Sequence, residues 1–109
     1  MKPIKVILWS DYLKNHPNLT GCLINQDNNI YWFQNGLWHR EDGPALEFAD
    51  GNKVWYKNGV RHREDGPAVE CSDGYRVWWV NGIRYATEQE WLVAMRKIKL
   101  EKVLKQIHT

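Results

Sequence analysis

A repeat of 23 residues runs along most of this 109-residue chain and restricts the folds that it can adopt. Tryptophan and histidine recur at that interval, in the same order in each copy. The equivalent tryptophans are Trp9, Trp32, Trp55 and Trp78, and the equivalent histidines are His16, His39 and His62. The block His-Arg-Glu-Asp-Gly-Pro-Ala occurs twice, at 39–45 and at 62–68. A repeat of this length predicts a row of similar units, each packed on its neighbours.

The turn residues predict that each unit contains a β-hairpin. Asn-Gly pairs recur at 35–36, 58–59 and 81–82, and Asp-Gly pairs at 50–51 and 73–74. Both pairs favour tight turns, because these residues adopt positive φ more readily than others. Between two such turns, Val54 and Tyr56 alternate with polar residues and tryptophan, so one face of the strand is apolar. The sequence leaves open whether the connector over 58–66 forms a third short strand.

The end of the chain predicts a helix. Thr87 followed by Glu90 forms a capping box, a pattern that begins many helices. From there, apolar residues recur at helical spacing in two offset stretches, 91–98 and 100–107. One stretch is expected to cap the sheet, which leaves the other for a partner or a second copy of the chain. Val80 and Ala86 stand where earlier units have polar residues, and we expect them beneath this helix.

The predicted fold class is therefore mostly β with a C-terminal helix. We expect an elongated antiparallel sheet of hairpin repeats, capped by an amphipathic α-helix, in a single domain over 1–109. Its parts are an irregular N-terminal segment with a worn repeat copy over 1–19, the hairpin repeats over 20–86 and the helix over 87–109.

Composition and charge argue against several classes of protein. Residues 1–87 carry ten basic and ten acidic side chains, so the net charge of +2 lies entirely in the tail. Polyanion binding needs a net positive surface, which makes nucleic acid an unlikely partner. Cys22 and Cys71 do not have the spacing of a zinc site or a disulfide framework. We read no leader peptide and no apolar run near the ~20 residues of a membrane span, so we expect a cytoplasmic protein.

The hairpin unit resembles a known repeat family. A 23-residue unit with Asp-Gly, Trp-Tyr and Asn-Gly motifs is similar to the MORN-type repeats, and is closer to their shorter YwqK-like variety. The similarity covers about residues 20–86, and only Trp9 and His16 keep the register before it. Small proteins with the His-Arg-Glu-Asp-Gly-Pro-Ala block look like ones seen in bacteriophage genomes. The resemblance implies a binding or scaffolding role and no catalytic residue.

Residues that recur in every unit are expected to form a structural ladder. Each repeated tryptophan is expected to fill the slot between neighbouring hairpins. We expect the charged residues of one block to pair with those of the next, and the histidines to hydrogen-bond across the stack. The predicted ladder comprises Trp32, Trp55, Trp78, His39, His62, Arg40, Arg63, Asp42 and Asp65. Cys22 shares the slot of Ala45 and Ala68, so it is expected to be buried.

Two other roles for these residues have less support: a metal site and a surface for stacking on bases. The pairs His39/Asp42 and His62/Asp65 contain metal-ligand types, but equivalent histidines would stand roughly 10 Å apart and no dense cluster occurs. We therefore expect no metal, cofactor or catalytic residue. The tryptophan series is also suited to stacking on bases. Binding or sequestering a nucleotide or nucleic acid through this aromatic face is the alternative function.

Positions that break the repeat are the candidates for partner binding. Trp38 stands where later units have arginine, and Tyr75 stands where earlier units have asparagine. Exposed aromatics are enriched at interface hot spots, although Trp38 is equally suited to packing against the N-terminal segment. The basic helix face contributes Arg96, Lys97 and Lys99. We expect a non-enzymatic protein-binding module of the small phage type, which binds and inhibits a host or cellular protein. Self-association through the helix or an edge strand is also open.

Overall fold

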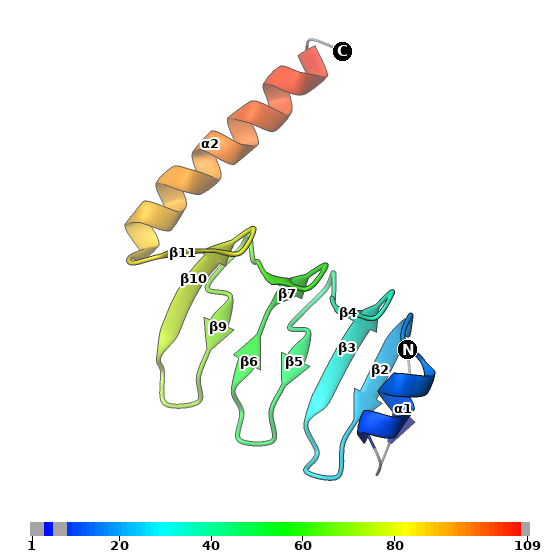
Figure 1. The fold of residues 1–109 in the computed structure, drawn as a ribbon. Coiled ribbons are helices and arrows are strands. Elements are labelled where there is room, and N and C mark those ends of the chain that lie inside the picture. Colours follow the sequence, from blue (N-terminus) through cyan, green and yellow to red (C-terminus); the bar gives the residue numbers. More distant parts are fainter. Residues whose placement is uncertain (1–3, 6–8, 108–109) are drawn as a thin grey trace.

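The computed structural model describes residues 4–5 and 9–107 and is mainly antiparallel β-sheet with one C-terminal helix, as predicted (Figure 1). Its principal extents are 47 × 39 × 20 Å, so the molecule is flat. The strands are β1 (Ile4–Lys5), β2 (Gly21–Ile24), β3 (Ile30–Gln34), β4 (Leu37–Trp38), β5 (Leu46–Glu47), β6 (Lys53–Val54), β7 (Tyr56–Lys57), β8 (Val60–Arg61), β9 (Val69–Glu70), β10 (Arg76–Val80) and β11 (Ile83–Tyr85). The helices are α1 (Trp9–Asn15) and α2 (Glu88–Ile107).

One sheet runs the length of the molecule in the order β1-β2-β3-β5-β6-β9-β10-β11, with β4 paired to β3. The pairing is antiparallel except between β1 and β2. A short strand follows each Asn-Gly turn and pairs back on the strand before it: β4 on β3, β8 on β7, and β11 on β10. The connector therefore begins with a third short strand, the point that the sequence left open.

The turns have the backbone that their residues favour. Asn35, Asn58 and Asn81 have φ of 52°, 49° and 51°, and the glycine after each also has positive φ. Two successive residues with positive φ make a type I′ turn, whose twist matches that of the strands it joins. The Asn-Gly motif thus sets the register of every unit.

The apolar residues pack into two buried clusters, one in the first units of the row and one beneath α2. Leu23, Tyr31, Phe33, Leu46 and Val54 form a buried cluster, one member following another across β2, β3, β5 and β6. The shared slot of Cys22, Ala45 and Ala68 is almost completely buried, as predicted. Next to this slot, the carbonyls of Ala45 and Ala68 accept hydrogen bonds from the amides of Trp32 and Trp55 in the preceding unit.

The N-terminal segment contains a helix instead of a worn hairpin. Residues 9–15 form α1, so Trp9 lies in a helix although its equivalents one and two repeats later follow the strand pattern. Tyr12 and Leu13 of α1 pack against the buried cluster, and this amphipathic contact favours the helix. The part of the segment over 1–3 and 6–8 lies outside the described residues.

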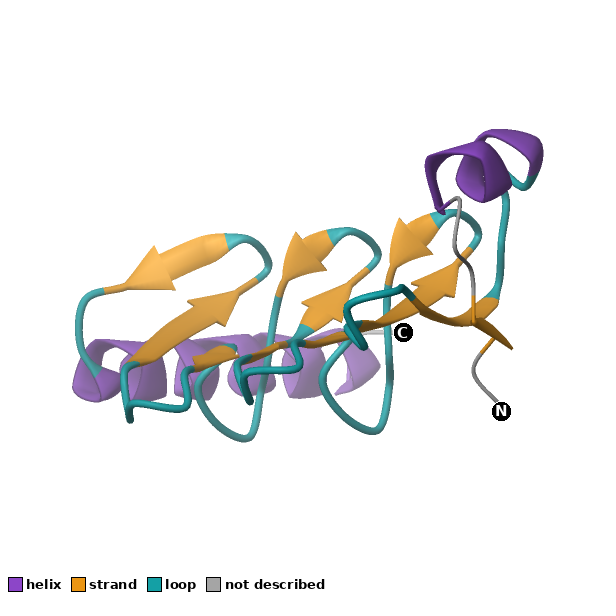
Figure 2. Cartoon of the chain, turned by 90° about the horizontal axis from the view of Figure 1, so that it is seen from below, coloured by secondary structure: helices purple, strands orange, loops and turns teal. Residues whose placement is uncertain are grey.

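Helix α2 begins where the capping box predicts. The amide of Glu90 donates to the Thr87 hydroxyl at 3.1 Å, and the Glu90 carboxylate accepts from the amide of Ala86 at 3.2 Å. Trp91 and Met95 are buried against Val80, so the first apolar stretch caps the sheet. Figure 2 shows α2 on the side of the sheet to which the connectors loop. In the described residues, neither helix combines the length and apolar content needed to cross a membrane.

Candidate partner-binding surfaces

In each His-Arg-Glu-Asp-Gly-Pro-Ala block, the arginine side chain hydrogen-bonds to other residues of the same block. Arg63 Nε donates to Asp65 at 2.7 Å, and its Nη1 donates to the carbonyl of Pro67 and to Glu70, both at 3.0 Å. Arg40 makes the equivalent contacts in the first block. The prediction that Arg40 and Asp42 would pair with Arg63 and Asp65 of the next block is therefore wrong. The connector bends tightly, so the carboxylate two residues after each arginine lies nearer to its guanidinium than the carboxylates of the other block do.

The same guanidiniums cover two of the repeated tryptophans. Arg40 Cζ lies 4.1 Å from the ring centroid of Trp32, and Arg63 Cζ lies 3.8 Å from that of Trp55. These cation–π contacts occupy a ring face that base stacking would need. Trp78 has no such arginine, since Ala86 stands in its slot, and the cluster of Val80, Trp91 and Met95 packs on it instead. The geometry therefore favours a packing role for this tryptophan series.

The block histidines link one unit to the next. His39 Nδ1 accepts a hydrogen bond from the backbone amide of Asn58, and His62 Nδ1 accepts one from Asn81, both at 2.9 Å. An amide can only donate, so each Nδ1 is unprotonated and Nε2 carries the proton. That Nε2–H donates to Glu41 at 2.7 Å and to Glu64 at 3.0 Å. The block therefore spans two units through a neutral imidazole.

We expect acid pH to lower the stability of the fold, because the carboxylates of the two blocks become protonated. The hydrogen bond from Arg63 lowers the pKa of Asp65, Arg40 lowers the pKa of Asp42 in the same way, and His62 lowers that of Glu64. A lowered pKa means that the unfolded chain binds more protons. Stability is then full above the ordinary values of 3.8 and 4.5 and is lost as the pH falls through the lowered ones. We expect the urea midpoint to fall between pH 6 and pH 3, less steeply in Glu64→Gln. A midpoint that is equal at both pH values would contradict this.

A cleft of about 490 Å³ lies between the two blocks. Its walls come from 40–44 and 62–65, and its floor is Trp55, Tyr56 and Lys57. The guanidiniums and carboxylates of its walls are largely engaged within their own blocks. No group of three or more potential metal ligands occurs in the part of the chain that the structure describes. We see no arrangement of nucleophile and base in this cleft.

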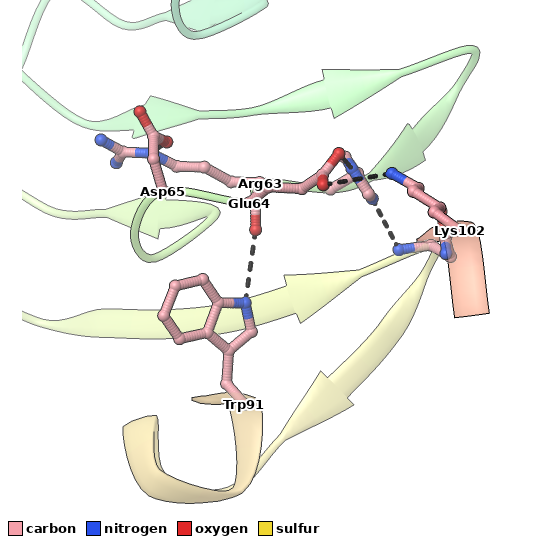
Figure 3. Close-up of polar contacts among 7 residues, drawn as sticks. Arg63, Glu64, Asp65, Trp91 and Lys102 are labelled. Carbon is pink, nitrogen blue, oxygen red and sulfur yellow. Dashed lines mark hydrogen bonds and ion pairs between the residues drawn. The ribbon is translucent and has the colours of Figure 1, made fainter. Parts of the chain in front are cut away.

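One repeat later, helix α2 fills the equivalent position. Trp91 Nε1 donates to the carbonyl of Arg63 at 3.3 Å, and Lys102 lies 3.5 Å from Glu64 (Figure 3). Val80, which takes the slot of Lys57, makes the floor apolar there. Val80, one of the two substitutions that break the repeat in the last unit, thus lies beneath the helix, as the sequence predicted. Ala86, the other, is exposed just before α2 begins, so that part of the prediction is wrong.

The cysteines lack the setting of a nucleophile. Burial raises the pKa of the Cys22 thiol, which keeps it in the unreactive protonated form. Cys71 is half-buried in the slot of Phe48, and both thiols are free.

The outer face of α2 is apolar and uncovered in the described structure. Successive residues turn by about 100°, which places four aliphatic residues in an arc of about 60°, opposite Trp91 and Met95. The four are 44% to 69% exposed, whereas Trp91 and Met95 are at most 5% exposed. The exposed charged residues that border the arc are both basic, Arg96 on one side and Lys97 on the other. We call this set the outer stripe: Val93, Leu100, Leu104 and Ile107, bordered by Arg96 and Lys97.

The structure spreads the other predicted partner-binding residues apart. Trp38 on β4 is half-buried and packs edge-on against Tyr56, with ring centroids 5.1 Å apart. Tyr75 is 55% exposed in the turn before β10, towards the other end of the sheet, and its hydroxyl accepts from Arg84. Lys99 is exposed on α2 but lies outside the arc. Of the predicted residues, only Arg96 and Lys97 therefore border the outer stripe.

Sequence reasoning marked 100–107 as a second apolar stretch but did not include Val93. Its signal was present, because Val93 precedes Leu100 and Ile107 at intervals of seven residues. A helical wheel drawn from the capping box would have placed the three side chains on one face.

Comparisons with protein-family models, curated proteins and solved structures gave no match, so the similarity to MORN-type repeats remains a prediction from the sequence.

Proposed function

We propose that this chain is a non-enzymatic module that binds another protein through the outer stripe of α2. In the phage setting that its repeated block suggests, the partner is a host protein, which the chain inhibits by occupying a surface. One observation carries the proposal: an exposed aliphatic face along a helix whose first turns are buried on the opposite side, through Trp91 and Met95. Helix faces of this kind dock in apolar grooves of partner proteins.

Charge indicates the kind of partner surface. Arg96 and Lys97 border the stripe on both sides, so two copies packed stripe to stripe would bring like charges together. A partner groove rimmed by aspartate and glutamate would instead pair with them. We therefore assign the stripe to an apolar groove with an acidic rim on a different protein.

The test is a pull-down from bacterial lysate with the full chain, with and without nuclease. Wild type is compared with the double variant Leu100→Glu, Leu104→Glu, with Arg96→Glu and with Lys105→Glu. Lys105 is the matched control, because it is exposed on α2 outside the stripe. We expect the double variant to weaken binding of the recovered protein at least about tenfold and Arg96→Glu to weaken it less. Lys105→Glu should bind as wild type does.

Two outcomes would contradict the proposal. The first is a partner protein that binds the double variant as tightly as wild type while circular dichroism shows both folded. The second is a partner lost on nuclease treatment, or a nucleotide released by heat. The second outcome would favour the alternative of nucleotide or nucleic-acid binding.

A further inference from the structure

The last hairpin of the row leaves half of one strand paired on a single side. Strand β10 pairs with β9 through Arg76 and Val77, and with β11 through Trp78, Trp79 and Val80. On the side of β11, no described strand pairs with Arg76 or Val77. Figure 1 shows this lower half of β10 at the outer margin of the sheet, with α2 beginning beyond β11. We call the backbone from Tyr75 to Trp78 the end edge.

The chain itself shows what occupies this position in the preceding units. Strand β5 docks on β3, with Glu47 opposite Ile30 and Leu46 opposite Tyr31. Strand β9 docks on β6 in the same register, as the next unit begins. In both cases a tryptophan amide donates to the carbonyl of the alanine at the start of the docked segment, Trp32 to Ala45 and Trp55 to Ala68, at 2.8 Å. The docked segments read Ala45-Leu-Glu and Ala68-Val-Glu, that is, small, aliphatic, glutamate.

The charge of Arg76 at the end edge also favours a glutamate in the segment that binds there. In the middle of the row, Lys53 has a glutamate opposite it on both sides, Glu47 on β5 and Glu70 on β9. Arg76 occupies the equivalent position one unit later and has Glu70 opposite it on one side only. A glutamate on an added strand would complete the arrangement that Lys53 already has. Opposite charges placed directly across two strands stabilise the pair.

One element of the internal docking site is missing at the end edge. The side-chain oxygen of Asn29 accepts from the amide of Ala49 at 2.9 Å, and that of Asn52 accepts from Ser72 at 2.8 Å. Each asparagine thus holds the end of the docked segment. Tyr75 stands in this slot in the last unit, and its hydroxyl bonds Arg84 instead. The end edge keeps the backbone groups and the charge of the site but lacks this contact.

We propose that the end edge binds an extended segment of a partner protein with the pattern small, aliphatic, glutamate. The segment adds antiparallel to β10, with its glutamate opposite Arg76 and its aliphatic side chain opposite Val77. Backbone hydrogen bonds hold the segment, and the glutamate selects it. This site is separate from the outer stripe, so the proposal does not depend on the proposed function.

The probe is a synthetic peptide with the sequence of residues 42–50, which in the chain docks on β3. It is titrated into the ¹⁵N-labelled full chain, and amide chemical shifts are followed. We expect saturable shifts centred on Arg76, Val77 and Trp78. A peptide carrying Glu47→Lys should bind about threefold to tenfold more weakly, since it places like charges across the strands.

The variant Tyr75→Asn makes the test sharper, because the proposal predicts that it binds the peptide more tightly than wild type does. Asparagine at this position restores the acceptor for the peptide amide that corresponds to Ala49. We expect the peptide to bind about twofold to tenfold more tightly, the effect of one added hydrogen bond. Tyr75→Ser, which is too short to reach, is the matched control and should not bind more tightly than wild type.

Three results would overturn the proposal: no saturable shift at millimolar peptide, shifts centred on another part of the chain, or equal affinity of the two peptides. Sedimentation without peptide provides the remaining check. Concentration-dependent association that Arg76→Glu abolishes would show that a second copy of the chain occupies the end edge instead of a partner.

Discussion

Replacing Trp91 with alanine is expected to lower the free energy of unfolding by about 3–5 kcal/mol. The indole is buried between α2 and the last hairpin, and its Nε1–H donates to the carbonyl of Arg63. Alanine would remove both the apolar contacts with Val80 and Met95 and this hydrogen bond. A loss of that size is a large part of the about 5–15 kcal/mol that stabilises a typical domain. Urea denaturation followed by circular dichroism measures it.

Two variants separate the causes of this loss. Val93→Ala is on the same helix but on the outer stripe, and should change stability by no more than about 0.5 kcal/mol. Trp91→Phe keeps an aromatic ring and removes only the hydrogen bond, so its free energy of unfolding should fall much less than that of Trp91→Ala. If Trp91→Ala and Val93→Ala were equally stable, α2 would not cap the sheet.

The substitution Gly36→Ala is expected to have the second large effect. Gly36 has φ of +80° in the first Asn-Gly turn, and a Cβ atom there would lie 2.0 Å from the carbonyl oxygen of Pro17. Its amide also donates to the carbonyl of Leu19 at 2.9 Å, so the turn and the segment after α1 are held in close contact. The backbone must move to admit the methyl group. We expect a loss of about 2–5 kcal/mol, the sum of backbone strain and overpacking.

Gly59→Ala is the matched control for this variant. It has φ of +83°, almost the same as Gly36, but its Cβ would meet Leu37 Cδ2 at 3.4 Å, an ordinary contact. It should therefore lose only the strain of a left-handed alanine, about 1–2 kcal/mol. The difference between the two urea midpoints measures the approach of the segment after α1 to the first turn. Equal losses would mean that this approach is not part of the folded state.

Local sequence signals predicted the hairpins and α2, because their causes lie within a few residues. Asn-Gly requires only that two neighbouring residues adopt positive φ, and Thr87 with Glu90 caps a helix through contacts within one turn. The period of 23 then places equivalent turns in a row. These features needed no knowledge of contacts between distant residues.

The errors arose where the folded geometry decides between two reasonable partners. Arg40 could reach a carboxylate in its own block or in the next, and only the bend of the connector makes Asp42 the nearer one. Trp9 keeps the repeat register, yet the contacts of Tyr12 and Leu13 with the core favour a helix there. Two opposite apolar faces were encoded in α2. Which of them docks depends on Val80, a residue of a different element.

The way in which α2 docks has a consequence for how such a chain changes length during evolution. The helix docks on the last unit and on the block before it, through Val80, Arg63 and Glu64. Each internal junction is made by the same histidine and asparagine contacts, whichever two units it joins. Duplication of 23 internal codons would therefore insert a new unit and leave both ends of the row as they are. The array is free to lengthen in whole steps, while the outer stripe and the end edge move outward together.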